Sequence, residues 1–112
     1  EWRLPDSSAN PYVALAAVIA AGLDGIDRQL EPPPPIDDDL YELPPDELTR
    51  RGATLLPQNL GEAVAALGTD NLLGDALGAE FVAEFLRLKR NEWIEFSRAV
   101  HAWETDRYAD FF

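Results

Sequence analysis

Residues 10–26, NPYVALAAVIAAGLDGI, are the stretch of sequence that decides the fold. Asn10 can accept hydrogen bonds from the free amides that begin a helix, and Pro11 has the backbone angle that suits the first helical position. Apolar residues follow through Ala21, and Gly22 and Gly25 predict the helix end. Because these residues occupy the whole circumference, the pattern predicts a helix buried on most sides. A chain of 112 residues cannot easily cover such a helix unaided, which indicates missing packing partners.

The sequence after this helix predicts a loop and then more helices. Residues 31–57 form a Pro/Asp-rich loop region, in which Pro32–Pro35 favours extended polyproline geometry and residues 46–50 form a short helical turn. Asn59, followed three residues later by Glu62, predicts a capped helix to Leu67. Two further helices are expected, one over residues 70–77 and one from 79 to about 103. Gly68 is expected to end the helix that reaches Leu67, and Gly78 the helix over 70–77. No convincing strand alternation or internal repeat is present, so the segment is expected to be mainly α.

Composition excludes several classes of function. The net charge of −12 argues against binding to nucleic acid or to anionic membranes, whose phosphates would repel the surface. The absence of cysteine rules out disulfides and thiolate chemistry within these residues. The longest apolar run, residues 12–23, is about half of a bilayer span, and we therefore expect a cytoplasmic protein. The chain begins at Glu1 and contains no methionine, which suggests a fragment or a processed product.

The residue types and their spacing do not indicate a complete catalytic set. The chain lacks a glycine-rich phosphate loop and His/Cys metal spacing, and a lone histidine such as His101 more often packs or meets the helix dipole than acts as a base. Asp37–Asp39 is expected to be a solvated acidic loop. Alternation places Glu1 and Arg3 on one side of an extended strand, where a carboxylate can ligate a divalent cation and a guanidinium can grip a carboxylate or phosphate. A surface salt-bridge pattern is the competing interpretation.

Several blocks resemble type I glutamine synthetases and their relatives, in the family's order and across essentially the whole chain. They are Glu1-x-Arg3-x-Pro5-Asp6, Ala9-Asn10-Pro11-Tyr12, Ala20-Ala21-Gly22-Leu23-Asp24-Gly25-Ile26, Leu40-Tyr41-x-Leu43-Pro44-Pro45 and Trp103-Glu104-x-x-x-Tyr108. The resemblance implies that residues 1–112 are the helical C-terminal portion of the α+β glutamine synthetase catalytic domain. It also implies one residual strand at residues 1–4.

The resemblance implies an enzyme, an ATP-dependent glutamate–amine ligase. In the family, ATP phosphorylates the γ-carboxylate of glutamate, and ammonia or a small amine then displaces phosphate to form an amide. Glu1 is similar to a glutamate that ligates a catalytic Mg²⁺ or Mn²⁺. Arg3 is similar to a catalytic, substrate-binding arginine near the transferring phosphoryl group, a role that suits a chemistry of positioning and charge neutralisation. The amine substrate stays open among ammonia, methylamine and polyamines.

Two other features of the family bear on regulation and assembly. Tyr41 stands at the position of a tyrosine that some bacterial members adenylylate, although other members hold a tyrosine here without that control. The aromatic end of residues 79–112, which taken alone could equally pack within the chain, is similar to a tail that joins two rings of a homododecamer. Its expected oligomer contacts are Trp103, Tyr108, Phe111 and Phe112.

Two departures qualify these expectations. Pro32–Pro35 replaces a stretch that usually contains glycine in the family, so the loop is expected to differ in shape. The remaining active-site groups of the family have no counterpart in these residues, so the isolated segment is expected to be inactive. The alternative function is a non-catalytic helical interaction module derived from the same fold.

Overall fold

The computed structural model describes residues 5–37 and 39–111, and these residues form a mainly helical chain, as predicted. The predicted strand at residues 1–4 lies outside the described residues, and no strand occurs within them. The elements in chain order are α1 (Pro11–Asp27), η1 (Leu40–Glu42), α2 (Pro45–Arg50), α3 (Leu60–Gly68), α4 (Asn71–Leu77), α5 (Ala79–Arg98), α6 (Ala102–Tyr108) and η2 (Ala109–Phe111).

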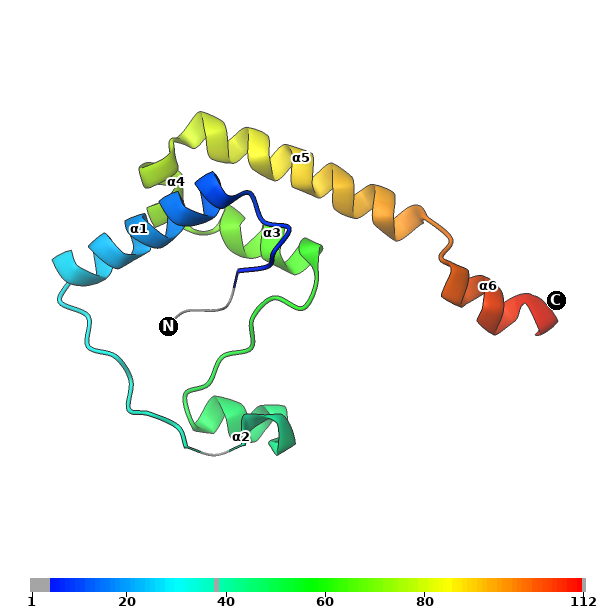
Figure 1. The fold of residues 1–112 in the computed structure, drawn as a ribbon, viewed down its shortest axis with the longest axis horizontal. Coiled ribbons are helices and arrows are strands. Elements are labelled where there is room, and N and C mark those ends of the chain that lie inside the picture. Colours follow the sequence, from blue (N-terminus) through cyan, green and yellow to red (C-terminus); the bar gives the residue numbers. More distant parts are fainter. Residues whose placement is uncertain (1–4, 38, 112) are drawn as a thin grey trace.

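Four helices make up the body of the molecule. Helix α1 packs on α4, and α5 packs on both α3 and α4. Between α1 and α3 the chain leaves the body as an extended loop that carries η1 and α2, and α6 continues beyond the far end of α5 (Figure 1). The radius of gyration is 18.1 Å, whereas about 13 Å is typical of a compact domain of this length.

The predicted helix starts are confirmed by their caps. The Asn10 side chain accepts hydrogen bonds from the amides of Tyr12 at 3.0 Å and Val13 at 3.4 Å. The Asn59 side chain accepts from the amide of Glu62 at 2.9 Å, and the Glu62 carboxylate accepts in return from the Gln58 amide at 2.8 Å. These bonds satisfy amides that a helix start would otherwise leave without partners.

Two predicted helix ends are wrong. Helix α1 does not end at Gly22 or Gly25 but continues to Asp27. A glycine inside a helix costs only about 1 kcal/mol relative to alanine, which the surrounding alanines and leucines tolerate. The end comes where Gln29 adopts a left-handed φ of 53°, and the Leu30 amide then donates back to the Gly25 carbonyl at 2.9 Å. This is the pattern of a Schellman-type helix end.

The predicted long helix from Ala79 is also shorter than expected. It ends at Arg98, and Ala99 has extended angles of φ −74° and ψ 134°. A separate helix, α6, begins at Ala102, where the Glu104 carboxylate accepts a hydrogen bond from the His101 amide at 3.0 Å. The Glu104 contact stabilises a new start, and α5 ends about five residues before the end that the sequence suggested.

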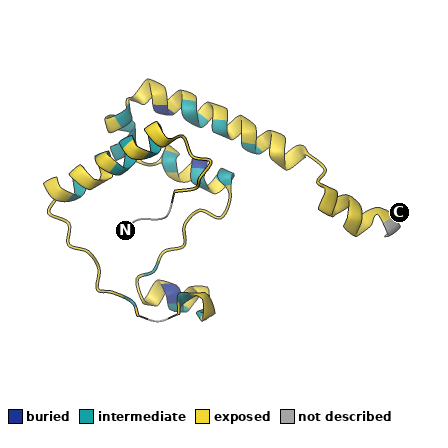
Figure 2. Cartoon of the chain, viewed as in Figure 1, coloured by how far each residue is buried: buried dark blue, intermediate teal, exposed yellow. Residues whose placement is uncertain are grey.

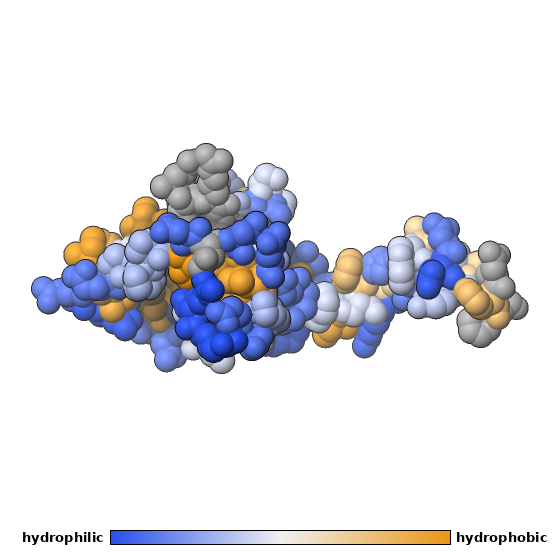
Figure 3. All heavy atoms as spheres, turned by 90° about the horizontal axis from the view of Figure 1, so that it is seen from below, coloured by the Kyte–Doolittle hydropathy of each residue, from blue (hydrophilic) through white to orange (hydrophobic). Residues whose placement is uncertain are grey.

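The buried core is small. Among the described residues only Leu48, Val64 and Val82 are buried, and α1 contains no buried residue (Figure 2). Within this chain α1 is therefore not buried on most sides, in keeping with the missing packing partners that its sequence indicates. A space-filling view shows a bulky body and a narrow C-terminal extension (Figure 3). None of the helices in residues 5–37 and 39–111 is long and apolar enough to cross a membrane.

Candidate functional site

The segment that follows the predicted active-site residues forms a tight turn into α1. Glu1 and Arg3 themselves lie outside the described residues. The Asp6 side chain accepts a hydrogen bond from the Ser8 amide at 2.6 Å, and the Ala9 amide donates to the Asp6 carbonyl at 3.1 Å. The hydrogen bond from the Ser8 backbone, followed by that from its side chain, lowers the pKa of Asp6 below its ordinary value. This turn fixes the direction in which the chain reaches Asn10.

The same segment forms one wall of an open groove of about 670 Å³. Helices α3 and α5 provide the other walls, and most of the lining is apolar, including Val64, Leu67 and Phe85. Its charged rim includes Lys89 and Glu92, which form an ion pair at 2.6 Å. Lys89 is the single lysine of the chain. Sequence patterning did not single it out, although it is half-buried and lies seven residues after the buried Val82, on the side of α5 that faces the body.

The described residues do not contain a complete metal site. No group of three or more histidine, cysteine, aspartate or glutamate side chains within residues 5–37 and 39–111 could hold a metal ion.

Tyr41 lies on the loop that leaves the body. Its side chain is fully exposed, and its amide donates to the Asp39 carboxylate at 3.0 Å, which caps η1. The loop that carries η1 and α2 runs apart from the four helices of the body (Figure 1).

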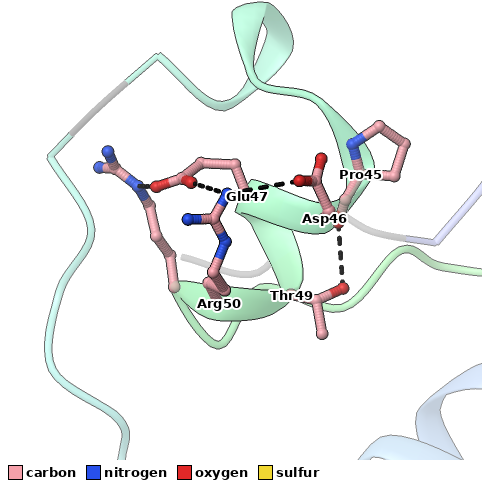
Figure 4. A network of polar contacts seen from close by, with 6 residues as sticks. Pro45, Asp46, Glu47, Thr49 and Arg50 are labelled. Atoms are coloured by element: carbon pink, nitrogen blue, oxygen red, sulfur yellow. Dashed lines mark hydrogen bonds and ion pairs between the residues drawn. The ribbon is translucent and has the colours of Figure 1, made fainter.

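A local polar network shapes the helix that follows Tyr41 (Figure 4). The Arg50 guanidinium contacts the carboxylates of Asp46 at 3.3 Å and Glu47 at 2.7 Å, and the Thr49 hydroxyl donates to the Pro45 carbonyl at 3.0 Å. Exposed ion pairs of this kind contribute about 0–1 kcal/mol each. The network therefore shapes the α2 turn locally, while Leu48 supplies its one buried side chain.

The aromatic tail is exposed. Trp103 and Tyr108 pack edge-to-face with ring centroids 6.1 Å apart, and both remain largely accessible, as does Phe111. Phe112 lies outside the described residues. The structure thus brings Trp103 and Tyr108 together. Helix α6, which carries both, lies apart from α2 (Figure 1). The His101 ring packs against Phe96 in a tilted arrangement at the start of the tail, with ring centroids 4.6 Å apart.

Comparison with known proteins covers nearly the whole chain. The family model described as glutamine synthetase, catalytic domain, matches residues 1–108. The chain belongs to the glutamine synthetase catalytic-domain family. Its relatives include the glutamate–methylamine ligase of Methyloversatilis universalis, 51% identical over all of this chain and 25% of that protein. The glutamine synthetase of Halobacterium salinarum is 48% identical over the same shares of the two chains.

A solved structure supports the same assignment of fold. The structure described as "Apo GmaS without ligand" aligns with a TM-score of 0.77 and 42% identity, over 96% of this chain and 24% of that one. This glutamine synthetase family chain therefore spans about a quarter of the length of the relatives it matches.

Proposed function

We propose that the full-length protein is an ATP-dependent ligase that joins the γ-carboxylate of glutamate to an amine, and that residues 1–112 are its C-terminal part. The observation that carries this proposal is the match of the family model to residues 1–108. The relatives described above carry the names of synthetases and ligases, which favours an enzyme over a non-catalytic interaction module.

Within this chain, Glu1 and Arg3 would carry the chemistry. The Glu1 carboxylate has the hard oxygen donors that Mg²⁺ or Mn²⁺ prefers. When bound, such a cation neutralises phosphate charge during phosphoryl transfer from ATP. The Arg3 guanidinium would hold the γ-carboxylate and the transferring phosphoryl group by bidentate hydrogen bonds. The remaining ligands and the nucleotide pocket would come from the rest of the polypeptide, so the 112-residue chain alone would be inactive.

The amine would be ammonia or a small alkylamine. Identities of 51% to a glutamate–methylamine ligase and 48% to a glutamine synthetase are too close to separate these substrates. A panel of ammonia, methylamine, ethylamine and putrescine, assayed with full-length enzyme, ATP, Mg²⁺ and glutamate, would identify it. Amine-dependent phosphate release with formation of a γ-glutamyl amide supports the proposal, and the absence of both products for every amine contradicts it.

The metal role has its own test. In the full-length enzyme, Glu1→Ala is expected to lower kcat by at least about a hundredfold, because charge stabilisation at one site is commonly worth that much. The assembled state on a sizing column should not change. A variant in the tail, Asp106→Asn, serves as the control for a lost carboxylate distant from the chemistry. Near-normal Mg²⁺-dependent activity of Glu1→Ala would refute the assignment.

Tyr41 and the tail would serve regulation and assembly. Full exposure of the Tyr41 side chain makes its hydroxyl accessible to a modifying enzyme, as adenylylation would require. The aromatic tail would contact a second copy in a homododecamer through Trp103, Tyr108, Phe111 and Phe112. The first three of these are exposed, and exposed aromatic clusters mark association surfaces.

A further inference from the structure

A run of four prolines, Pro32–Pro35, lies in the loop between α1 and η1. Residues 31–37 belong to no helix, strand or turn, and their backbone groups form no hydrogen bond with any other described part of the chain. All four prolines are exposed, and the loop that carries them runs apart from the helices of the body (Figures 1 and 2). The proline rings are therefore presented to solvent on a segment that leaves the body.

The geometry of this run follows from its covalent structure. Each proline ring holds φ near about −65°, and a residue that precedes proline is pushed to an extended ψ. Glu31 and the first three prolines all precede a proline. The resulting angles are those of a polyproline II helix, which has about three residues per turn and no internal hydrogen bonds. Pro32 and Pro35 are one turn apart, so they lie along the same edge of that helix.

An acidic side chain stands at each end of the run. Glu31 precedes the first proline directly, Asp37 follows the last by two residues, and both are exposed. Neither carboxylate takes part in an ion pair with another residue that the structure describes. Because the sequence also carries a net charge of −12, the field around the run favours a positively charged partner.

This combination limits the chemistry that can recognise the segment. Prolines carry no backbone N–H, so the run cannot be bound as an added β-strand. Its rings can instead pack into a groove lined by aromatic side chains, which is the usual way in which polyproline II segments are recognised. The run already has the bound conformation, so binding orders it at little cost in entropy.

We propose that residues 31–37 are a docking segment for a protein module with an aromatic-lined groove and a basic side chain at each end of that groove. Pro32 and Pro35 enter the groove, and Glu31 and Asp37 pair with the two basic ends. The proposal goes beyond ligase activity and does not depend on it. Its tests measure binding, so failure of the amine panel and failure of docking are separate results.

A semi-rigid spacer is the competing role for a proline run. A spacer keeps η1 and α2 away from the body through its stiffness and needs no partner. The two roles therefore differ in whether the full-length protein binds a module of the stated chemistry through its prolines.

Fluorescence anisotropy tests the docking of defined modules. The probes are dye-labelled SH3 and WW domains, chosen for lysine or arginine at both ends of the aromatic groove, and each is titrated with full-length protein. Saturable binding of at least one domain is expected, and added salt is expected to weaken it because the pairing charges are exposed. If none of the domains binds, the run is a spacer or is covered in the full-length protein, and the proposal is overturned.

Substitutions in the loop show whether binding uses the prolines. Pro32→Ala combined with Pro35→Ala is expected to weaken binding by about tenfold or more, because the groove loses both rings. The thermal unfolding midpoint should not change, since both side chains are exposed. Pro57→Ala, at an exposed proline outside the run, is the matched control and should bind as wild type does. Equal binding by the double variant would assign the attraction to net charge alone and would overturn the proposal.

Reversal of the flanking charges tests the fit of the two ends. Glu31→Lys combined with Asp37→Lys is expected to weaken binding to the basic-ended domain and to strengthen binding to a domain with acidic ends, since opposite charges across an interface set partner choice. If the preference between the two domains stays as in wild type, the assigned pairing of Glu31 and Asp37 is wrong.

Discussion

At the residue scale, Gly61 of α3 lies close against the Trp93 ring of α5. A Cβ atom on Gly61 would lie 2.6 Å from the indole Nε1 and 2.8 Å from Cε2. Because the indole is rigid, Gly61→Ala is expected to destabilise the body by about 1–3 kcal/mol through overpacking. Circular dichroism recorded during thermal unfolding measures this loss of stability. Gly68→Ala, whose Cβ meets nothing within 4 Å, is the control, and equal stability of the two variants would contradict the contact.

A second prediction at this scale concerns the pKa of Glu84. The Arg87 guanidinium donates to both Glu84 carboxylate oxygens, at 2.8 and 2.6 Å, and lowers the pKa of Glu84 below its ordinary value. Stability from this exposed pair is small, present above the unfolded-state pKa of glutamate, and lost as pH falls through the lowered value. NMR titration of the Glu84 carboxyl should show its pKa rise in Arg87→Met and stay lowered in Arg90→Gln. An unchanged value in Arg87→Met would show that the ion pair does not form in solution.

At the scale of elements, α3 depends on its N-terminal cap. Asn59→Ala removes the acceptor for the Glu62 amide and the donor to its carboxylate at 2.7 Å. The expected loss is about 1 kcal/mol of stability, the usual value for a helix cap. Urea unfolding measures it, and Asn59→Asp, which keeps an oxygen acceptor, should recover most of the loss. If Asn59→Ala unfolds at the wild-type urea concentration, the cap contributes nothing.

Helix starts were predictable from sequence and helix ends were less so. The caps at Asn10 and Asn59 involve residues within three positions, so local sequence contains the whole interaction. The end of α1 depends on a left-handed angle at Gln29, a residue type that gives no warning of it. The break after Arg98 depends on competition between continuing α5 and the Glu104 contact that starts α6, and apolar periodicity contains no information about that balance.

At the scale of the whole molecule, the tail is a separate arm. In full-length protein, removal of residues 103–112 is expected to leave smaller assemblies, because the exposed rings of Trp103, Tyr108 and Phe111 would no longer contact a second copy. Sizing by light scattering measures the change. Val100→Ser, on the exposed turn before the tail, is the control. An undisturbed assembly after the deletion would contradict the proposed role of the tail.

The candidate site was predictable only through resemblance. Spacing alone could not distinguish Glu1 and Arg3 from a surface salt bridge, because one carboxylate and one guanidinium do not define a reaction. Their geometry falls outside the described residues, so both roles stay predictions. Tyr41 and the aromatic side chains of the tail at positions 103, 108 and 111 are exposed, and exposure does not identify what binds there, so their roles also stay predictions.

The placement of two tryptophans has a practical consequence for spectroscopy. Trp93 is packed against Gly61 in the body, whereas Trp103 lies largely exposed on the tail. In a protein in which the other tryptophans are replaced by phenylalanine, each indole would emit from a different environment. Trp93 would report loosening of α3 from α5 by a red shift, and Trp103 would report engagement of the tail by a blue shift. With Trp93 and Trp103 each kept as the single tryptophan of its own variant, folding and assembly could be followed as two separate optical signals.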